Sequence, residues 1–214
     1  MKKIIAFDCD STLSAIEGVD ELARLAGDDI FRQVEELTNQ AMNGEVPVEE
    51  VFARRLNLIK PTHQQCKAVG QMYLEQIEPT ARETIATLQA DDWDCLIISG
   101  GFAPCIESIA NELNIRRIEA VPLQFDANGN YLGFDETYPT TRDGGKPDII
   151  AQLKKEFTPD IIVMVGDGVS DLETKPFVNH FIGFLRYAER EKVANNCEKS
   201  AKSLSQVLDL LNKM

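Results

Sequence analysis

The sequence predicts an α/β protein whose doubly wound, mostly parallel sheet is interrupted by a helical insert after its first strand. Three observations lead to this prediction: short Ile/Val-rich runs, helical segments that alternate with these runs after residue 79, and a long stretch before residue 79 that is helical throughout. Continuous apolar runs are typical of strands covered on both faces. Alternating strands and helices imply a parallel sheet with helices on both sides.

The first strand is the apolar run Ile4–Phe7, which ends in two carboxylates, Asp8 and Asp10, and then two hydroxyls, Ser11 and Thr12. Because side chains alternate along a strand, we expect Asp8 and Asp10 to point the same way. Ligands of open α/β sheets bind beyond the carboxyl ends of the strands. Two acids there repel each other unless a cation or a shared proton relieves them. The pattern therefore indicates a hard metal ion, a nucleophile and an acid.

The insert spans residues 15–78, and we predict that residues 1–14 and 79–214 form the core around it. Apolar side chains repeat every three or four residues from Val19 and again from Phe31, which is the spacing of helices that pack on one face. A third stripe follows Pro47. A further helix is predicted over Thr62–Ile77, with a proline just before its start.

From Pro79 onward, strands and helices alternate to the end of the chain. The predicted elements are, in order, helix Thr80–Ala90, strand Asp94–Ile98, helix Phe102–Leu113, a hairpin of Leu123–Phe125 and Tyr131–Phe134, helix Lys146–Phe157, strands Ile161–Val165 and Phe181–Phe184, and helix Ser203–Asn212. An Asn-Gly turn signal lies between the two hairpin strands. This order predicts a Rossmann-like core.

Composition excludes several classes of partner. The formal net charge is −13, spread along the chain, which disfavours binding to nucleic acid and to anionic membrane surfaces. The five cysteines are scattered without a C-x-x-C pair, as is typical of reduced thiols in a cytosolic protein. We find neither a signal peptide nor an apolar stretch long enough to cross a membrane. We therefore predict a cytoplasmic protein with a small-molecule substrate, and leave a homodimer open.

Three predicted strand ends carry polar groups: Asp8 with Asp10, Ser99 with Gly100, and Asp167. Taken singly, each motif is more often a turn or a helix cap, but strand ends far apart in sequence meet in one crevice of a doubly wound sheet. One carboxylate there can attack phosphorus, and a second can protonate the leaving oxygen. Mg²⁺ prefers carboxylate oxygens such as those of Asp8 and Asp167, with a backbone carbonyl near Asp10.

A phosphate group also needs hydrogen-bond donors. Ser99 and the Gly100 amide, if they open a helix, form an anion site of backbone N–H groups. Lys146 follows two glycines at a predicted helix start, where a cation is unfavourable for the helix dipole, so we interpret it as a phosphate ligand rather than a surface lysine. Asp171 lies four residues after Asp167, and we interpret it as a metal ligand or as a brace for one.

The motifs at the strand ends, taken together, are similar to those of a known family. The chain resembles the haloacid dehalogenase-like phosphohydrolases in residues 8–13, 98–101, 146 and 166–171. Within that superfamily it is most similar to the phosphoserine phosphatases, over essentially the whole chain. This closer likeness lies in residues 16–23, in residues 42–50 with Arg54 and Arg55, and in residues 131–137 leading to 144–146.

The resemblance implies roles for the acids and a reaction. Asp8 would be the nucleophile and Asp10 the general acid and base, with Mg²⁺ on Asp8, the Asp10 carbonyl and Asp167. The implied reaction is hydrolysis of O-phospho-L-serine to L-serine and phosphate through an aspartyl phosphate, the last step of serine biosynthesis. Closure of the insert, residues 15–78, as a cap would exclude bulk water until that intermediate has formed.

The resemblance also implies how the substrate is held. Ser99, Gly100 and Lys146 would bind its phosphate, while Glu17 would meet its ammonium group and Arg55 its carboxylate. A zwitterionic substrate needs one acid and one cation, and arginine can bind a carboxylate through two parallel hydrogen bonds. Without the motifs, we would interpret Glu17 and Arg55 as exposed surface residues.

The chain departs from its relatives at several positions. Ser170 stands where Asn or Thr is common and can still donate a hydrogen bond to the substrate, Val48 replaces a Phe, and Glu119–Leu123 replaces an Asn-Arg/Lys-Leu pattern. These departures leave two alternatives: a phosphatase or phosphotransferase acting on another small phosphomonoester, and a non-catalytic protein that binds a phosphorylated metabolite. Intact Asp8, Asp10 and Asp167 argue against the second, because a binding protein needs no nucleophile.

Overall fold

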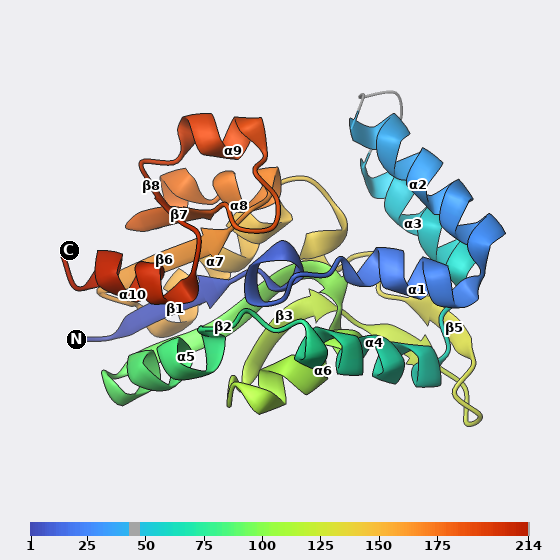
Figure 1. The fold of residues 1–214 in the computed structure, drawn as a ribbon, viewed down its shortest axis with the longest axis horizontal. Helices are drawn as coiled ribbons and strands as arrows, with labels where there is room; N and C mark the ends of the chain where they lie inside the picture. The colour runs from blue at the N-terminus through green and yellow to red at the C-terminus, as the bar shows by residue number, and fades with distance from the viewer. Residues whose placement is uncertain (43–47, 214) are drawn as a thin grey trace.

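The chain folds around a six-stranded parallel sheet, shown in the computed structural model of Figure 1, which describes residues 1–42 and 48–213. The strand order is β3-β2-β1-β6-β7-β8, and every neighbouring pair is parallel. The strands are β1 (Lys3–Phe7), β2 (Trp93–Phe102), β3 (Arg117–Val121), β6 (Ile161–Gly166), β7 (His180–Phe184) and β8 (Lys199–Ala201). The order reverses direction between β1 and β6, so the site predicted after β1 lies at the switch point of the sheet.

The sheet is buried on both faces, which confirms the doubly wound prediction. Alternate residues of β1 point to opposite sides: Ile5 and Phe7 belong to one apolar cluster, while Ile4 and Ala6 belong to another. The helices of the core are α5 (Ala81–Ala90), α6 (Ala103–Glu112), α7 (Gly145–Phe157), α8 (Val169–Leu172), α9 (Glu191–Asn196) and α10 (Leu204–Leu211). Helices α5, α6 and α10 cover the first face, and α7 and α9 contribute to the second.

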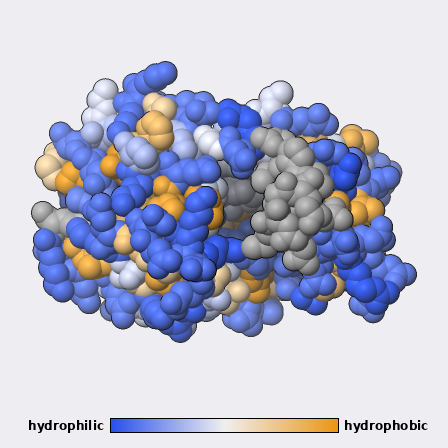
Figure 2. Space-filling view, turned by 90° about the horizontal axis from the view of Figure 1, so that it is seen from above, coloured by the Kyte–Doolittle hydropathy of each residue, from blue (hydrophilic) through white to orange (hydrophobic). Residues whose placement is uncertain are grey.

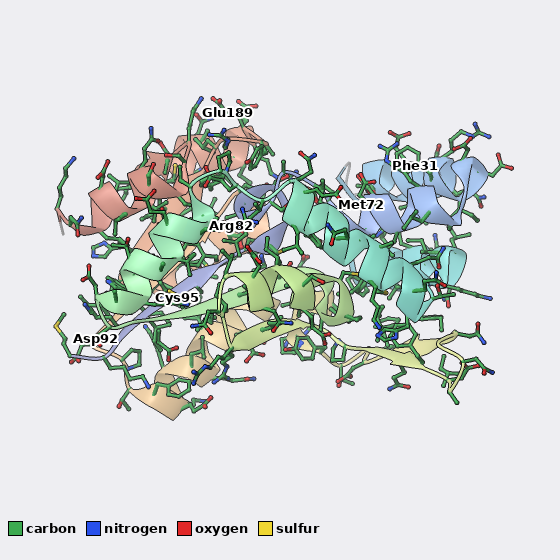
Figure 3. The ribbon with its side chains drawn as sticks, turned by 60° about the horizontal axis from the view of Figure 1, so that its bottom comes forward. Phe31, Met72, Arg82, Asp92, Cys95 and Glu189 are labelled. Atoms are coloured by element: carbon green, nitrogen blue, oxygen red, sulfur yellow. The ribbon has the colours of Figure 1, made fainter. Side chains whose placement is uncertain are left out.

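The insert is helical, as predicted, and lies between β1 and α5. It consists of α1 (Gly18–Ala26), α2 (Asp28–Met42), α3 (Val48–Ile59) and α4 (His63–Glu75). Helices α2 and α3 stand away from the sheet in Figure 1, whereas α4, the helix that carries Met72 in Figure 3, runs beside α6 of the core. A backbone bridge between Ser14 and Ile77 brings the two ends of the insert together.

The hairpin of β4 (Leu123–Phe125) and β5 (Tyr131–Phe134) forms as predicted and contacts the insert. The ring centroids of Phe52 in α3 and Phe134 in β5 lie 5.4 Å apart. The ring centroids of His63 and Phe125 lie 5.2 Å apart, and the His63 amide donates to the Gly129 carbonyl. His63 is therefore a packing residue.

Two features of the strands differ from the prediction. Strand β2 continues to Phe102, so Ser99 and Gly100 lie within a strand and α6 begins only at Ala103. Strands β3 and β8 are absent from the prediction because neither contains a long apolar run. The resemblance includes residues 42–50, but residues 43–47 and the side chain of Val48 lie outside the described residues.

The face shown in Figure 2 is largely hydrophilic, and its apolar residues are scattered in small groups. Within the described ranges, no helix combines the length and the apolar character needed to cross a membrane.

Candidate active site

A tight turn after β1 places the first two acids. Asp8 follows the end of the strand, and its Oδ1 accepts a hydrogen bond of 2.7 Å from the Cys9 amide. Ser11 then adopts φ 49°, a left-handed conformation that is uncommon outside glycine, and the turn closes with the Ser14 amide on the Cys9 carbonyl at 3.1 Å. Our expectation that strand alternation orients Asp10 is therefore wrong: Asp10 lies in the turn, not in the strand.

Lys146 joins two of the acids. Its Nζ lies 2.8 Å from Asp8 Oδ2 and 2.6 Å from Asp171 Oδ1, and all three side chains are buried. Burial acts to lower the pKa of Lys146, but the charges of Asp171 and Asp8 outweigh it, so the pKa is raised and the ammonium form is kept. A methyl group on Gly145 would lie 1.7 Å from the Pro139 carbonyl oxygen, so only glycine lets α7 start where it places Lys146.

Asp8, Asp167 and Asp171 form an acidic cluster from two strand ends. Each offers one carboxylate oxygen, and these oxygens all lie within 4.8 Å of one another. Burial, and then the charge of Asp8, raises the pKa of both Asp167 and Asp171. Hard oxygen ligands at this spacing suit a divalent cation, which would also relieve their repulsion. The predicted ligands Asp8 and Asp167 are thus brought together, with Asp171 beside them.

Asp10 lies in a different environment from Asp8. Its Oδ1 accepts hydrogen bonds from the Gly18 amide at 3.0 Å and from the Tyr73 hydroxyl. The pKa of Asp10 is raised well above its ordinary value, chiefly by burial and then by the charges of Glu17 and Asp8. A raised pKa favours the protonated form of a carboxyl group, which is the form that a general acid needs.

Ser99 and Gly100 sit at the carboxyl end of β2, next to β1. The Ser99 Oγ accepts a hydrogen bond of 3.0 Å from the Gly101 amide. The predicted anion site at a helix start is wrong in one respect, because α6 begins three residues after Gly100 and the helix end does not supply these donors. Around Gly100 the space is open: the nearest atom to an added Cβ would be the Thr140 carbonyl oxygen, at 3.8 Å.

Glu17 enters the site from the start of the insert. Its Oε1 accepts a hydrogen bond of 2.7 Å from Ser11 Oγ and lies 3.4 Å from Arg190 Nη2. The Nε of the same Arg190 lies 3.0 Å from Asp167 Oδ2. Burial raises the pKa of Glu17, and the Ser11 hydrogen bond and the charge of Arg190 oppose that rise.

Arg55 and Ser170 lie apart from the acidic cluster. Arg55, on α3, has its Nη1 3.5 Å from Thr38 Oγ1, while its Nε is buried without a hydrogen-bond partner among the described residues. Burial lowers the pKa of Arg55, and the charges of Asp20 and Glu17 oppose this. Ser170 is exposed on α8. Within residues 1–42 and 48–213, neither side chain is hydrogen-bonded to Asp8, Asp10 or Asp167.

Two residues of the site, Tyr73 and Arg190, were absent from the sequence prediction. Tyr73 lies on the apolar stripe of a predicted helix, where a tyrosine is usually only a packing residue. Arg190 lies on the segment between β7 and α9, and no spacing relates it to Asp167 or Glu17. Cys9, between the two acids, is fully buried, and its pKa is raised well above the ordinary value by burial and then by Asp10 and Asp8.

Comparison with known proteins shows where this arrangement occurs. Residues 2–174 match the haloacid dehalogenase-like hydrolase family. The chain is 41% identical to the phosphoserine phosphatase of Bos taurus, over 91% of this chain and 86% of the relative, and 39% identical to that of Homo sapiens with the same coverage. The crystal structure of a phosphoserine phosphohydrolase-like protein from Francisella tularensis superposes with a TM-score of 0.84 at 25% identity, covering 98% of this chain and 99% of that one. The chain therefore belongs to the haloacid dehalogenase-like hydrolases and, within them, to the phosphoserine phosphatase family.

Proposed function

We propose that this protein hydrolyses O-phospho-L-serine to L-serine and phosphate through an aspartyl phosphate, with Mg²⁺ as its metal. The observation that carries the proposal is the contrast between two neighbouring acids. Asp8 is paired with the Lys146 ammonium at 2.8 Å, whereas Asp10 is buried with a raised pKa. A salt-bridged Asp8 suits a nucleophile and the raised pKa of Asp10 suits a proton donor, which is the division of roles that phosphoryl transfer to an aspartate requires.

In the first step, an Asp8 carboxylate oxygen forms a bond to phosphorus as the bond to the serine oxygen breaks. Asp10 gives its proton to that oxygen, so serine leaves as a neutral hydroxyl. Lys146 lies 2.8 Å from Asp8 Oδ2 and would place its charge beside the phosphate oxygens, together with the Ser99 hydroxyl and the Gly100 amide. A Mg²⁺ ion held by Asp8, the Asp10 carbonyl and Asp167 would supply further positive charge to these oxygens.

In the second step, water replaces Asp8 on phosphorus. Asp10, now ionised, takes a proton from the water, the bond between Asp8 and phosphorus breaks, and phosphate leaves. Asp10 ends the cycle protonated and Asp8 ends it as a carboxylate, so both acids return to their starting states. Asp171 acts here as a brace, because its Oδ1 lies 2.6 Å from Lys146 Nζ and its Oδ2 accepts from the Gly168 amide at 2.9 Å.

Recognition of the serine part falls to the insert, which we propose as a cap formed by residues 15–78. The buried Arg55 Nε has no partner among the described residues and would bind the substrate carboxylate, while Glu17 would bind the ammonium group. Ser170 would add a hydroxyl donor after the cap closes. Glu17 and Arg55 belong to the insert and Ser170 to the core, so bound substrate would hold the cap against the core.

The proposed reaction also implies a pathway step and a cellular compartment. The product, L-serine, places the reaction at the last step of serine biosynthesis. All five cysteines are unpaired, which supports a reducing compartment, and we propose the cytoplasm.

A comparison of three related phosphate esters tests whether the enzyme prefers phosphoserine. O-phosphoethanolamine lacks only the carboxylate of phosphoserine, and 3-phosphooxypropionate lacks only its ammonium group. We expect kcat/KM for phosphoserine to exceed both by about tenfold or more, because each missing charge leaves a charged partner unpaired. Chelation should abolish phosphate release and Mg²⁺ should restore it. Equal turnover of all three esters would contradict the assignment of phosphoserine.

The variant Arg55→Ala tests whether Arg55 binds the substrate carboxylate. It should lower kcat/KM for phosphoserine by about tenfold or more, the worth of a hydrogen bond between charged groups, and leave O-phosphoethanolamine unaffected. Arg54→Ala is the control, since Arg54 is the exposed neighbour and pairs with Glu50 on the surface of the same helix. Equal losses with the two esters in Arg55→Ala would show that Arg55 does not bind the carboxylate.

A further inference from the structure

We propose that Tyr73 is a positioning residue for the general acid, and that with the Gly18 amide it confines the transferred proton to the Oδ2 atom of Asp10. The inference rests on the proposed function, since it assigns the proton that this hydrolysis moves. It concerns an interaction between the insert and the core: Tyr73 lies on α4, and Asp10 lies in the turn after β1.

The Tyr73 hydroxyl is held in place from several sides. The side chain is fully buried, and its backbone carbonyl accepts a hydrogen bond of 3.2 Å from Ser14 Oγ. The helix α4 that carries it packs along α6 of the core, seen in Figure 3 beside Met72. An added Cβ on Gly18 would lie 2.1 Å from Tyr73 Oη, so the chain leaves room for this hydroxyl only because residue 18 is glycine.

Both donors that hold Asp10 act on the same oxygen. The Tyr73 hydroxyl and the Gly18 amide, the latter at 3.0 Å, donate to Oδ1. A carboxylate oxygen has two in-plane lone pairs, so these two hydrogen bonds saturate Oδ1. A proton placed on Oδ1 would displace one of them inside a buried site, where an unpaired donor is costly. The proton of the neutral acid therefore resides on Oδ2.

The free oxygen faces the end of β2. Asp10 Oδ2 lies 3.3 Å from the position that a Cβ on Gly101 would take, next to Ser99 Oγ, which lies at the same distance from that position. Oδ2 has no hydrogen-bond partner in the part of the chain that the structure describes. A side chain at residue 101 would crowd the one atom of Asp10 that can donate a proton, at the strand end where the phosphate would be held.

How strongly the reaction depends on the positioned proton of Asp10 is set by the basicity of the leaving group. During hydrolysis of phosphoserine, the bond between phosphorus and the serine oxygen breaks, Asp8 bonds to phosphorus, and the proton moves from Asp10 Oδ2 to the serine oxygen. A serine alkoxide is a strong base and needs that proton, whereas p-nitrophenolate is stable in water and leaves without one. A residue that only positions the acid should therefore matter for phosphoserine and not for p-nitrophenyl phosphate.

Tyr73→Phe removes the hydroxyl and keeps the ring. We expect kcat/KM for phosphoserine to fall about tenfold and kcat/KM for p-nitrophenyl phosphate to change less than about twofold, so the ratio of the two falls. In an Asp10→Asn background, which has no acid to position, Tyr73→Phe should lower that ratio no further. Tyr138→Phe is the matched control, since it removes another tyrosine–carboxylate hydrogen bond, 2.6 Å to Glu119 Oε2, outside the site.

The outcomes separate this inference from the proposed function. Wild-type protein without phosphoserine turnover would overturn both. Wild-type turnover with an unchanged ratio in Tyr73→Phe, or an equal fall for both esters, would overturn the role of Tyr73 alone. Should Tyr73→Phe fail to fold, Tyr73→Met fills the same cavity without a hydroxyl, and the same ratio decides.

Discussion

At the residue scale, the site is a set of acids that differ in their partners. Asp8 and Asp171 share the Lys146 ammonium, Asp167 shares the Arg190 guanidinium with Glu17, and Asp10 has only neutral donors. Because their surroundings differ in this way, chemically similar side chains can take different roles.

Lys146→Met tests this arrangement through stability. The variant leaves Asp8 and Asp171 buried with no shared cation, and breaking a buried pair in this way typically costs about 3–5 kcal/mol. The free energy of unfolding of the metal-free protein, measured by urea titration at neutral pH, should fall by that amount. Lys154→Met, at an exposed position of the same helix, serves as the control. Equal losses in the two variants would mean that the Lys146 ion pairs contribute nothing.

At the element scale, two glycines lie at the proposed phosphate ligands: Gly100 is one of them, and Gly145 precedes another, Lys146. A side chain would be excluded from the two positions for different causes. Gly145 lets the start of α7 pass the Pro139 carbonyl, where a Cβ would lie 1.7 Å from the oxygen. Gly100, at the end of β2, has no such neighbour, because its nearest contact would be 3.8 Å. The first glycine is needed to build the fold, and the second lies in open space that the proposed substrate would occupy.

The variants Gly145→Ala and Gly100→Ala distinguish an effect on folding from an effect on substrate binding. Gly145→Ala should lower the free energy of unfolding by about 3 kcal/mol or more, because the backbone must shift to relieve the clash. Gly100→Ala should leave the midpoint of thermal unfolding nearly unchanged and lower kcat/KM for phosphoserine, since the methyl group occupies the phosphate space. A strongly destabilised Gly100→Ala would contradict this account of the β2 end.

The elements also show what a sequence can reveal. Strands β1, β6 and β7 are continuous apolar runs, and the predicted boundaries agree with the structure to within one residue. The short edge strand β8 carries polar residues because an edge needs no apolar run, so pattern alone misses it. The end of β2 was assigned to a helix start because Ser-Gly-Gly is typical of one, although tertiary pairing extends the strand to Phe102.

The same holds for the site. Acids at strand ends are visible in the sequence because a parallel sheet gathers its carboxyl ends, which is how Asp8, Asp10 and Asp167 were found. The contacts of Tyr73 and Arg190 depend on how the insert and the segment after β7 dock on the core. No local pattern encodes such docking, so neither residue was predicted. The metal-site assignments, the substrate ligands and the division at residues 15–78 remain predictions.

At the scale of the whole molecule, the protein concentrates buried acids on a chain that already carries a net charge of −13. Burial is the largest cause of the raised pKa values of Asp10, Glu17, Asp167 and Asp171. The folded metal-free protein therefore binds more protons than the unfolded chain at pH values between the ordinary and the raised pKa values. Its stability must then fall as the pH rises through that window.

Thermal unfolding tests whether stability falls, rather than rises, as the pH increases. We expect the midpoint of thermal unfolding of the metal-free protein to fall as the pH rises above the ordinary carboxyl pKa of about 4. Mg²⁺ should raise the midpoint more at higher pH, where fewer protons compete for the carboxylates. Asp10→Asn removes one titrating group and should flatten the dependence. A midpoint that rises over this range would contradict the assignment of raised pKa values to the site.

The central claim is that Asp8 carries the phosphoryl group between the two steps. The most direct measurement is an acid quench of the enzyme during turnover of phosphoserine labelled in its phosphate, followed by mapping of the labelled peptide. We predict label on Asp8 in the wild-type protein, lost on treatment with hydroxylamine as an acyl phosphate should be, and no label in Asp8→Asn. Turnover with no labelled protein, or label that persists in Asp8→Asn, would contradict the account.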